Sequence, residues 1–146
     1  MAYNTMPSVR PADTQTPAPY TVLVVEDEVL VRLALAEYLR DCGFQVLEAA
    51  TGDEAIEVLT ARGEEVDLVF SDVQMPGKTD GFALAHWIRD KIPGMRIILT
   101  SGVGHAASKA ENLCLDGPMI QKPYDHKALL GEIRRLQERA RKNGHS

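Results

Sequence analysis

Short apolar runs with a strand pattern alternate with helix-like segments along most of this chain, and this alternation restricts the fold more than any other feature. The runs are rich in β-branched residues and too short for buried helices. They cover residues 20–25, 44–49, 66–71, 95–102 and 118–121. One helical pattern ends at Gly43; others span residues 51–63, 80–94 and 125–142, and a short one lies within residues 104–115. Strand and helix therefore alternate five times, which predicts a parallel sheet with helices on both faces and right-handed crossovers.

Local signals support three of these helices. In the first, Val31, Ala34, Leu35, Tyr38 and Cys42 recur at helical spacing. In the second, Thr51 and Glu54 have the spacing of a capping box. The last has Asp125 near its start, and Leu129, Ile133 and Leu136 mark its inner face.

The length of 146 residues allows one domain with short tails. Residues 1–19 are rich in Pro, Thr, Ser and Ala, a composition that predicts a flexible arm because proline excludes a continuous helix or central strand. We place the domain at residues 20–142 and a disordered tail at residues 143–146. No helix-turn-helix or catalytic domain follows the last helix, so a stand-alone protein and a fragment of a larger protein both stay open.

Charge and hydropathy exclude several function classes. The net charge is −5, which argues against direct DNA binding. No apolar run approaches the roughly twenty residues of a membrane span. The N-terminus lacks a charged-then-apolar signal pattern, so the sequence predicts a cytoplasmic protein with no membrane contact.

Polar residues follow the apolar runs, where ligands of parallel α/β sheets bind. The first run is followed by Glu26, Asp27 and Glu28, the third by Asp72, the fourth by Thr100, Ser101 and Gly102, and the fifth by Gln121, Lys122 and Pro123. Three crowded carboxylates (Glu26, Asp27 and Asp72) repel one another unless a proton or a cation neutralises them. A group of ligands that offers oxygen atoms and includes neither His nor Cys suits Mg²⁺. With Lys122 and Ser101 beside them, these acids predict a site for a phosphoryl group.

The stretches VLVVEDE, FSDVQMPG, IILTSG and QKPY resemble, in order and spacing, the receiver domains of bacterial two-component response regulators. Each motif is weak alone, but the ordered set is highly specific. The resemblance covers about residues 20–140. It implies a flavodoxin-like (βα)5 fold, a doubly wound five-stranded parallel sheet of order 2-1-3-4-5 with helices on both faces.

The resemblance also implies roles for the acids. Asp72 corresponds to the phosphoacceptor; the alternative is an ordinary turn cap. Asp27 corresponds to the direct Mg²⁺ ligand and Glu26 to a ligand that acts through water. Asp72 and the main-chain carbonyl of Gln74 complete the implied metal site. The alternative for Glu26 and Asp27 is an acidic helix start that favours the dipole.

Further roles follow from the same resemblance. Lys122 corresponds to the lysine that pairs with the acceptor and then with a phosphoryl oxygen, and the bond to Pro123 is typically cis in this family. The hydroxyl that moves toward the phosphoryl group is Ser101, with the adjacent Thr100 as the alternative. Gly102 is small and leaves room for that group.

One position departs from the family pattern. Many receivers carry an aromatic residue three positions before the lysine, where this chain has Met119. Methionine is flexible, so we expect signalling through backbone shifts in the loop after Ser101 in place of an aromatic rotamer switch.

The implied function is that of a signalling protein that catalyses its own phosphorylation and dephosphorylation. A sensor histidine kinase or phosphotransfer protein would donate the phosphoryl group, and an unknown downstream protein would receive the signal. The resemblance implies a stand-alone regulator, with a receiver fragment of a larger regulator or hybrid kinase as the alternative. The oligomeric state stays open, a dimer included.

Three rivals fit the residues less well. A Mg²⁺-dependent aspartyl-phosphate phosphatase usually has Asp-x-Asp after the first strand, where this chain has EDE. A nucleotide or flavin module would need a Gly-rich loop there. A receiver that is never phosphorylated would lack pocket residues that this chain keeps.

Overall fold

The structure of the protein is a computed structural model that describes residues 19–101, 119–122 and 124–144. In chain order its elements are β1 (Thr21–Val25), α2 (Val29–Asp41), β2 (Gln45–Ala49), α3 (Gly52–Arg62), the 3₁₀ helix η2 (Gly63–Glu65), β3 (Leu68–Asp72), α4 (Gly81–Lys91), β4 (Arg96–Ser101), β5 (Met119–Gln121) and α6 (His126–Gly144). The predicted helix within residues 104–115 and the predicted arm, up to residue 18, lie outside the described residues.

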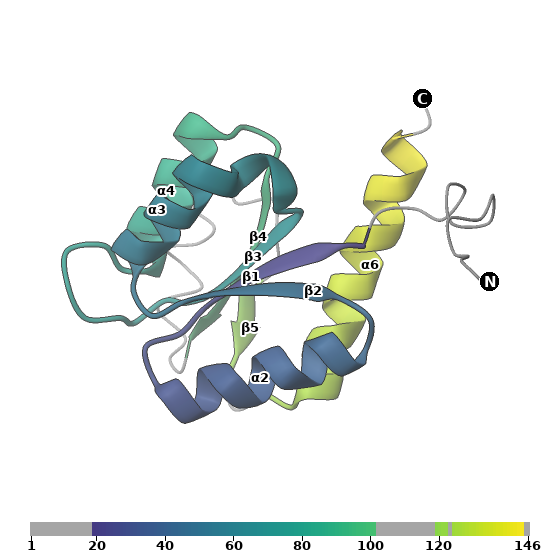
Figure 1. Cartoon of the computed structure of the whole chain (residues 1–146), viewed down its shortest axis with the longest axis horizontal. Helices are drawn as coiled ribbons and strands as arrows, with labels where there is room; N and C mark the ends of the chain where they lie inside the picture. The colour runs from purple at the N-terminus through teal and green to yellow at the C-terminus, as the bar shows by residue number, and fades with distance from the viewer. Residues whose placement is uncertain (1–18, 102–118, 123, 145–146) are drawn as a thin grey trace, which may run out of the picture.

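The five strands form one parallel sheet in the order β2-β1-β3-β4-β5 (Figure 1). Val22 of β1 lies between Val46 of β2 and Leu68 of β3. The short strand β5 pairs with the end of β4, where Leu99 lies opposite Met119. Because all five strands run parallel, their carboxyl ends share one edge of the sheet. The predicted doubly wound sheet and its strand order are confirmed.

Helices cover both faces of the sheet, with α3 and α4 on one face and α2 and α6 on the other (Figure 1). Successive residues of a strand point to opposite faces. Leu23 and Val69 therefore pack on the α3–α4 side, while Val24 and Phe70 pack on the α2–α6 side. Burial on both faces explains why these strands are continuous apolar runs without polar alternation.

Side-chain caps start two helices at the predicted places. Thr51 Oγ1 accepts a hydrogen bond from the Glu54 N–H at 3.0 Å, and Asp125 Oδ1 accepts one from the Ala128 N–H at 2.6 Å. Each bond satisfies an N–H group that the first helical turn leaves unpaired. The capping box of α3 is shifted, however, because the Glu54 carboxylate accepts from the Ala50 N–H at 2.8 Å and not from Thr51.

The buried stripe of α2 differs from the sequence prediction. Val31 is 40% exposed and Ala34 is also exposed, whereas the helix buries Leu35, Ala36 and Leu39. The reason is the place of the helix start. α2 begins at the carboxyl edge of the sheet, so its first turns have less of the sheet to pack against.

The last helix, α6, confirms its predicted inner face and extends past its predicted end. Leu129, Ile133 and Leu136 are 0% exposed. The helix continues to Gly144, beyond the predicted domain boundary at residue 142, because residues 132–143 contain neither Gly nor Pro to end it. Among the described helices, α6 included, none has the length and apolarity needed to cross a membrane.

Candidate functional site

Three carboxylates meet at the carboxyl edge of the sheet. Glu26 and Asp27 follow β1, and Asp72 ends the neighbouring strand β3. One carboxylate oxygen from each residue lies within 4.8 Å of the other two. Glu26 is 4% exposed and Asp72 is 5% exposed, while Asp27 is partly exposed. The structure thus brings together the three acids that the sequence analysis grouped, and it leaves Glu28 exposed outside the group.

Both oxygens of the Asp72 carboxylate accept hydrogen bonds. Lys122 Nζ donates to Oδ2 at 2.7 Å, and the Gln74 main-chain N–H donates to Oδ1 at 3.0 Å. Lys122 reaches this place because it directly follows β5, where its own N–H donates to the Ser101 carbonyl at 2.7 Å. The predicted lysine and the predicted phosphoacceptor therefore form an ion pair.

The loop of residues 73–80, which carries the predicted carbonyl ligand, is held in place by two contacts. The Gly81 N–H donates to the Val73 carbonyl at 2.8 Å and closes the loop on itself. Thr79 Oγ1 donates to Asp53 Oδ1 at 2.6 Å, which ties the loop to the first turn of α3. The loop is therefore a defined wall of the site.

Two glycines let this loop pack closely against its neighbours. A Cβ on Gly52 would lie 2.3 Å from the Thr79 carbonyl oxygen, and one on Gly81 would lie 2.5 Å from the Asp72 carbonyl oxygen. Both distances are shorter than van der Waals contact allows, so neither position accepts a side chain without a shift of the main chain. The glycines thus bring the loop close to α3 and to the end of β3.

Burial raises the pKa of the Glu26 carboxyl above its usual range. The charge of Asp72 and a side-chain hydrogen bond with Asp27 raise it further. Two contacts oppose the shift: the Glu28 N–H, which donates to Glu26 Oε2 at 3.1 Å, and the charge of Lys122. The net direction is upward because burial, the largest cause, acts together with the charge of Asp72.

The acids also shift the pKa of their basic and phenolic neighbours. Burial alone would lower the pKa of Lys122, but the hydrogen bond and charge of Asp72 and the charges of Glu26 and Glu28 outweigh it and raise the pKa. Burial, together with the charges of Glu26 and Asp72, raises the pKa of Tyr124 to about 12. Lys122 is therefore a cation and Tyr124 a neutral phenol at neutral pH.

The two hydroxyl candidates are both buried at the end of β4. Thr100 lies opposite Asp72 in the β3–β4 register, and its Oγ1 has no hydrogen-bond partner among the described residues. Ser101 stands one residue nearer the edge, so both stay candidates. The predicted positions Gly102 and Pro123 lie outside the described residues, and of Met119 only the main chain in β5 is described.

The donor set of this cluster fits Mg²⁺. The described group of potential ligands consists of three carboxylates without His or Cys, and Mg²⁺ prefers oxygen ligands. A bound cation would also offset the repulsion between Glu26 and Asp72, which adds to the pKa shift that burial causes.

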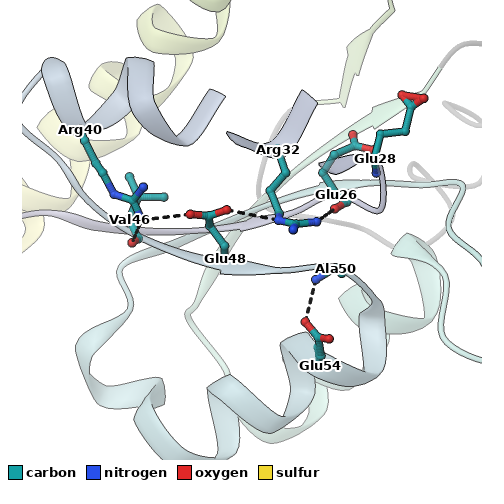
Figure 2. Close-up of polar contacts among 8 residues, drawn as sticks. All are labelled: Glu26, Glu28, Arg32, Arg40, Val46, Glu48, Ala50 and Glu54. Carbon is teal, nitrogen blue, oxygen red and sulfur yellow. Dashed lines mark hydrogen bonds and ion pairs between the residues drawn. The ribbon is translucent and has the colours of Figure 1, made fainter. Parts of the chain in front are cut away.

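Sequence reasoning missed Arg32, which contacts the end of β1 from α2. Its Nη1 donates to the Glu26 main-chain carbonyl at 2.8 Å, and its Nε donates to Glu48 at 3.2 Å (Figure 2). In the sequence, Arg32 has the pattern of an ordinary charge on a helix surface. The pairing of β1 with β2 could have indicated this role, because it places Glu48 beside Val24, near the edge of the sheet where Glu26 lies.

Comparison with known proteins identifies the family of the chain. A family model described as the response regulator receiver domain matches residues 22–134, from β1 into α6. The chain belongs to this family. As a receiver domain, it is a signalling module of a two-component system.

Curated relatives of the receiver domain are longer proteins. The chain is 39% identical over 121 residues to Sensor kinase CckA from Brucella abortus, a match that covers 82% of this chain and 13% of the kinase. It is 30% identical over 119 residues to the uncharacterized transcriptional regulatory protein YbdJ from Bacillus subtilis, a match that covers 82% of this chain and 51% of YbdJ. The transcriptional regulatory protein PdtaR from Mycobacterium tuberculosis is 40% identical over 90 residues, a match that covers 61% of this chain and 42% of PdtaR. The chain thus spans about half of these relatives or less.

Solved structures of receiver domains share the fold. A receiver domain protein from Clostridium thermocellum superposes with a TM-score of 0.77 at 25% identity and covers 84% of this chain and 97% of its own. The response regulator protein TrrA from Thermotoga maritima, solved in complex with Mg²⁺-BeF, has a TM-score of 0.72 at 30% identity. The match covers 80% of this chain and 98% of TrrA.

Glu26→Gln should stabilise the receiver domain in the absence of Mg²⁺. The change removes one crowded charge and keeps an acceptor for the Glu28 N–H. At pH 7 we expect a melting temperature higher by roughly 2–4 °C, the shift that about 1 kcal/mol gives in a domain of this size. The raised pKa fixes the sign of the pH dependence. The gain should vanish as the pH falls through the pKa of Glu26, since the wild-type carboxyl is then protonated as well.

Saturating Mg²⁺ should stabilise the wild type more than the Glu26→Gln variant, because the variant lacks one acid. Scanning calorimetry with and without Mg²⁺, from pH 4 to pH 8, measures both effects. A lower melting temperature of the variant without Mg²⁺ would show that Glu26 is not under repulsion.

Proposed function

We propose that the chain is a phosphoacceptor response regulator that takes a phosphoryl group onto Asp72, with Mg²⁺, from a sensor histidine kinase or a phosphotransfer protein. One observation carries this proposal. The Asp72 carboxylate is bound by Lys122 at 2.7 Å and lies within 4.8 Å of the carboxylate oxygens of Glu26 and Asp27. A cation site beside a lysine-bound carboxylate suits transfer of a group with several anionic oxygens.

In the proposed step, a carboxylate oxygen of Asp72 attacks the phosphorus of the donor's phosphohistidine. The P–O bond forms while the P–N bond breaks, and the leaving imidazole keeps the electron pair of that bond and takes up a proton. The product is an aspartyl phosphate, so this is nucleophilic catalysis by a carboxylate. Attack of water on the same phosphorus then releases phosphate and restores Asp72.

The other site residues would bind and orient the phosphoryl group. Lys122, a cation at neutral pH, would transfer its hydrogen bond from Asp72 to a phosphoryl oxygen. Glu26, Asp27, Asp72 and the Gln74 carbonyl would hold the metal. When bound, Mg²⁺ supplies positive charge that neutralises the phosphoryl oxygens. The Ser101 hydroxyl would donate to a phosphoryl oxygen, with Gly102 leaving room.

The surface beside the site supports a protein donor. Four large apolar residues are exposed among the described residues, and all lie on α2: Val29 at 54%, Leu30 at 81%, Val31 at 40% and Leu33 at 47%. α2 starts two residues after Asp27, so this apolar surface adjoins the site. Asp72 is only 5% exposed, and a donor must reach it over this edge. An apolar helical face around the donor's phosphohistidine would fit the surface.

The proposal applies to a stand-alone regulator and to the receiver part of a larger regulator or hybrid kinase alike. The curated relatives are longer than this chain, and the site lies wholly within residues 26–122. The proposed domain, residues 20–142, contains all of its residues. The proposed output is a conformational change that a downstream protein recognises.

Asp72→Asn should abolish phosphorylation by acetyl phosphate, because it replaces the attacking oxygen by an amide. With Mg²⁺ and acetyl phosphate, the wild type should gain the mass of one phosphoryl group, as measured by intact mass spectrometry. Lys122→Ala should slow the gain by roughly 100-fold, the typical cost of one donor to a transition-state oxygen. Asp90→Asn, a change at an exposed acid of α4, is the matched control and should behave as wild type.

A mass gain that persists in Asp72→Asn would contradict the proposed acceptor. Sustained turnover of phosphate esters by the wild type would instead indicate a Mg²⁺-dependent phosphatase.

Ser101→Ala and Thr100→Val should separate the two hydroxyl candidates. Ser101→Ala should slow phosphorylation by acetyl phosphate by roughly 10-fold or more, because a phosphoryl oxygen loses its donor. Thr100→Val should leave the rate unchanged and stabilise the domain by about 1 kcal/mol, since it removes a buried hydroxyl that has no described partner. Mass-spectrometric rates and urea unfolding measure the two effects. If Thr100→Val were phosphorylated slowly and Ser101→Ala at the wild-type rate, the role would belong to Thr100.

A further inference from the structure

We infer that Arg32 is a positioning residue for the acid pair Glu26 and Asp27 and strengthens Mg²⁺ binding, an inference that rests on the proposed function. The guanidinium reaches from α2 to the main-chain carbonyl of Glu26, where Nη1 donates at 2.8 Å. Figure 2 shows this contact at the turn between β1 and α2. Arg32 thus bonds the main chain that carries two of the three clustered acids, without being one of their side-chain partners.

Because of peptide geometry, the contact of Arg32 with the Glu26 carbonyl also restrains the main chain of Asp27. The peptide bond between Glu26 and Asp27 is planar, so a carbonyl held in place also fixes the direction of the Asp27 N–H and Cα. Glu26 is held at two further points: its N–H donates to the Ala49 carbonyl at 3.0 Å, and its Oε2 accepts from the Glu28 N–H at 3.1 Å. The main chain between the two acids therefore has little freedom, which keeps their carboxylates within reach of Asp72.

Arg32 is itself anchored on β2. Its Nε donates to Glu48 Oε1 at 3.2 Å, and Arg40 Nη2 donates to Glu48 Oε2 at 3.2 Å and to the Val46 carbonyl at 2.8 Å. Glu48 thus lies between two arginines of α2 (Figure 2). The side chains of Arg32 and Glu48 are only 15% and 22% exposed, so solvent screens this pair incompletely. The planar guanidinium can hold the carboxylate and the carbonyl at the same time.

The direction in which Mg²⁺ binding changes when Arg32 is replaced distinguishes a positioning role from an effect of its charge. Arg32 is a cation near a cation site, so charge alone predicts that its removal reduces repulsion and strengthens Mg²⁺ binding. Positioning predicts the opposite, because loss of a group that orients metal ligands weakens metal binding. Arg32→Gln removes both the charge and the forked geometry. Arg32→Lys keeps the charge but loses the fork, so it should weaken binding only if positioning matters.

The test is calorimetric titration of Mg²⁺ into the unphosphorylated protein, residues 1–146. We expect Arg32→Gln to raise the Mg²⁺ dissociation constant by roughly tenfold or more, and Arg32→Lys to raise it by less. Glu48→Gln should act in the same direction, because it loosens the anchor of Arg32. Arg62→Ala is the matched control, since Arg62 is an exposed arginine paired with Glu65 at the end of α3, and it should leave the constant unchanged.

An unchanged or lower dissociation constant in Arg32→Gln would overturn the inference, whatever its melting temperature, because Arg32 would then act on stability or charge alone. If Arg32→Gln does not fold, Glu48→Gln and Arg40→Ala carry the test. Weaker Mg²⁺ binding in them supports the inference, and unchanged binding overturns it. A wild type that binds no Mg²⁺ would contradict the proposed function itself, which is a different result from a wild type and an Arg32→Gln variant that bind equally.

Discussion

Repulsion among three carboxylates at one edge of the sheet is the constraint on which the rest of this site depends. Glu26 and Asp72 are almost fully buried, and charges interact more strongly there than in water. Lys122 offsets part of the repulsion by pairing with Asp72. Burial raises the pKa of Glu26, and the charge of Asp72 raises it further. The parallel sheet produces this crowding, because the carboxyl ends of β1 and β3 lie side by side.

The surrounding contacts hold the acids in this unfavourable arrangement. Arg32 and the Ala49 carbonyl bind the main chain of Glu26, and the Gln74 N–H binds Asp72. The loop before α4 is closed on itself and tied to α3. A site preorganised in this way needs little rearrangement to bind a cation and then a phosphoryl group. A change of charge in such a site is a local event that can bias the loops attached to it.

The sequence alone predicts the parts of this structure that depend on periodicity and on strand ends. Apolar runs locate the five strands of the sheet, and the parallel topology then brings Glu26, Asp27, Asp72 and Lys122 together. The strand order came from the family resemblance, since alternation alone allows several orders. Caps at Thr51 and Asp125 were predictable because they depend on residues three positions apart.

Contacts between elements were not predictable in the same way. Arg32 and Glu48 meet because α2 packs over β2 at a particular height, which helical periodicity does not encode. The exposure of Val31 depends on where α2 starts relative to the sheet edge. The Thr100 hydroxyl has no hydrogen-bond partner among the described residues, a property that depends on its neighbours in three dimensions. Sequence reasoning thus identifies the residues that perform the proposed chemistry more readily than the residues that position them.

The most direct test is a crystal structure of the protein with Mg²⁺ and beryllofluoride, a mimic of the phosphoryl group. We expect one metal ion bound by Asp27, Asp72 and the Gln74 carbonyl, and beryllofluoride on Asp72 in contact with Lys122. Beryllofluoride on another residue, or a metal held without Asp27 and Asp72, would contradict it.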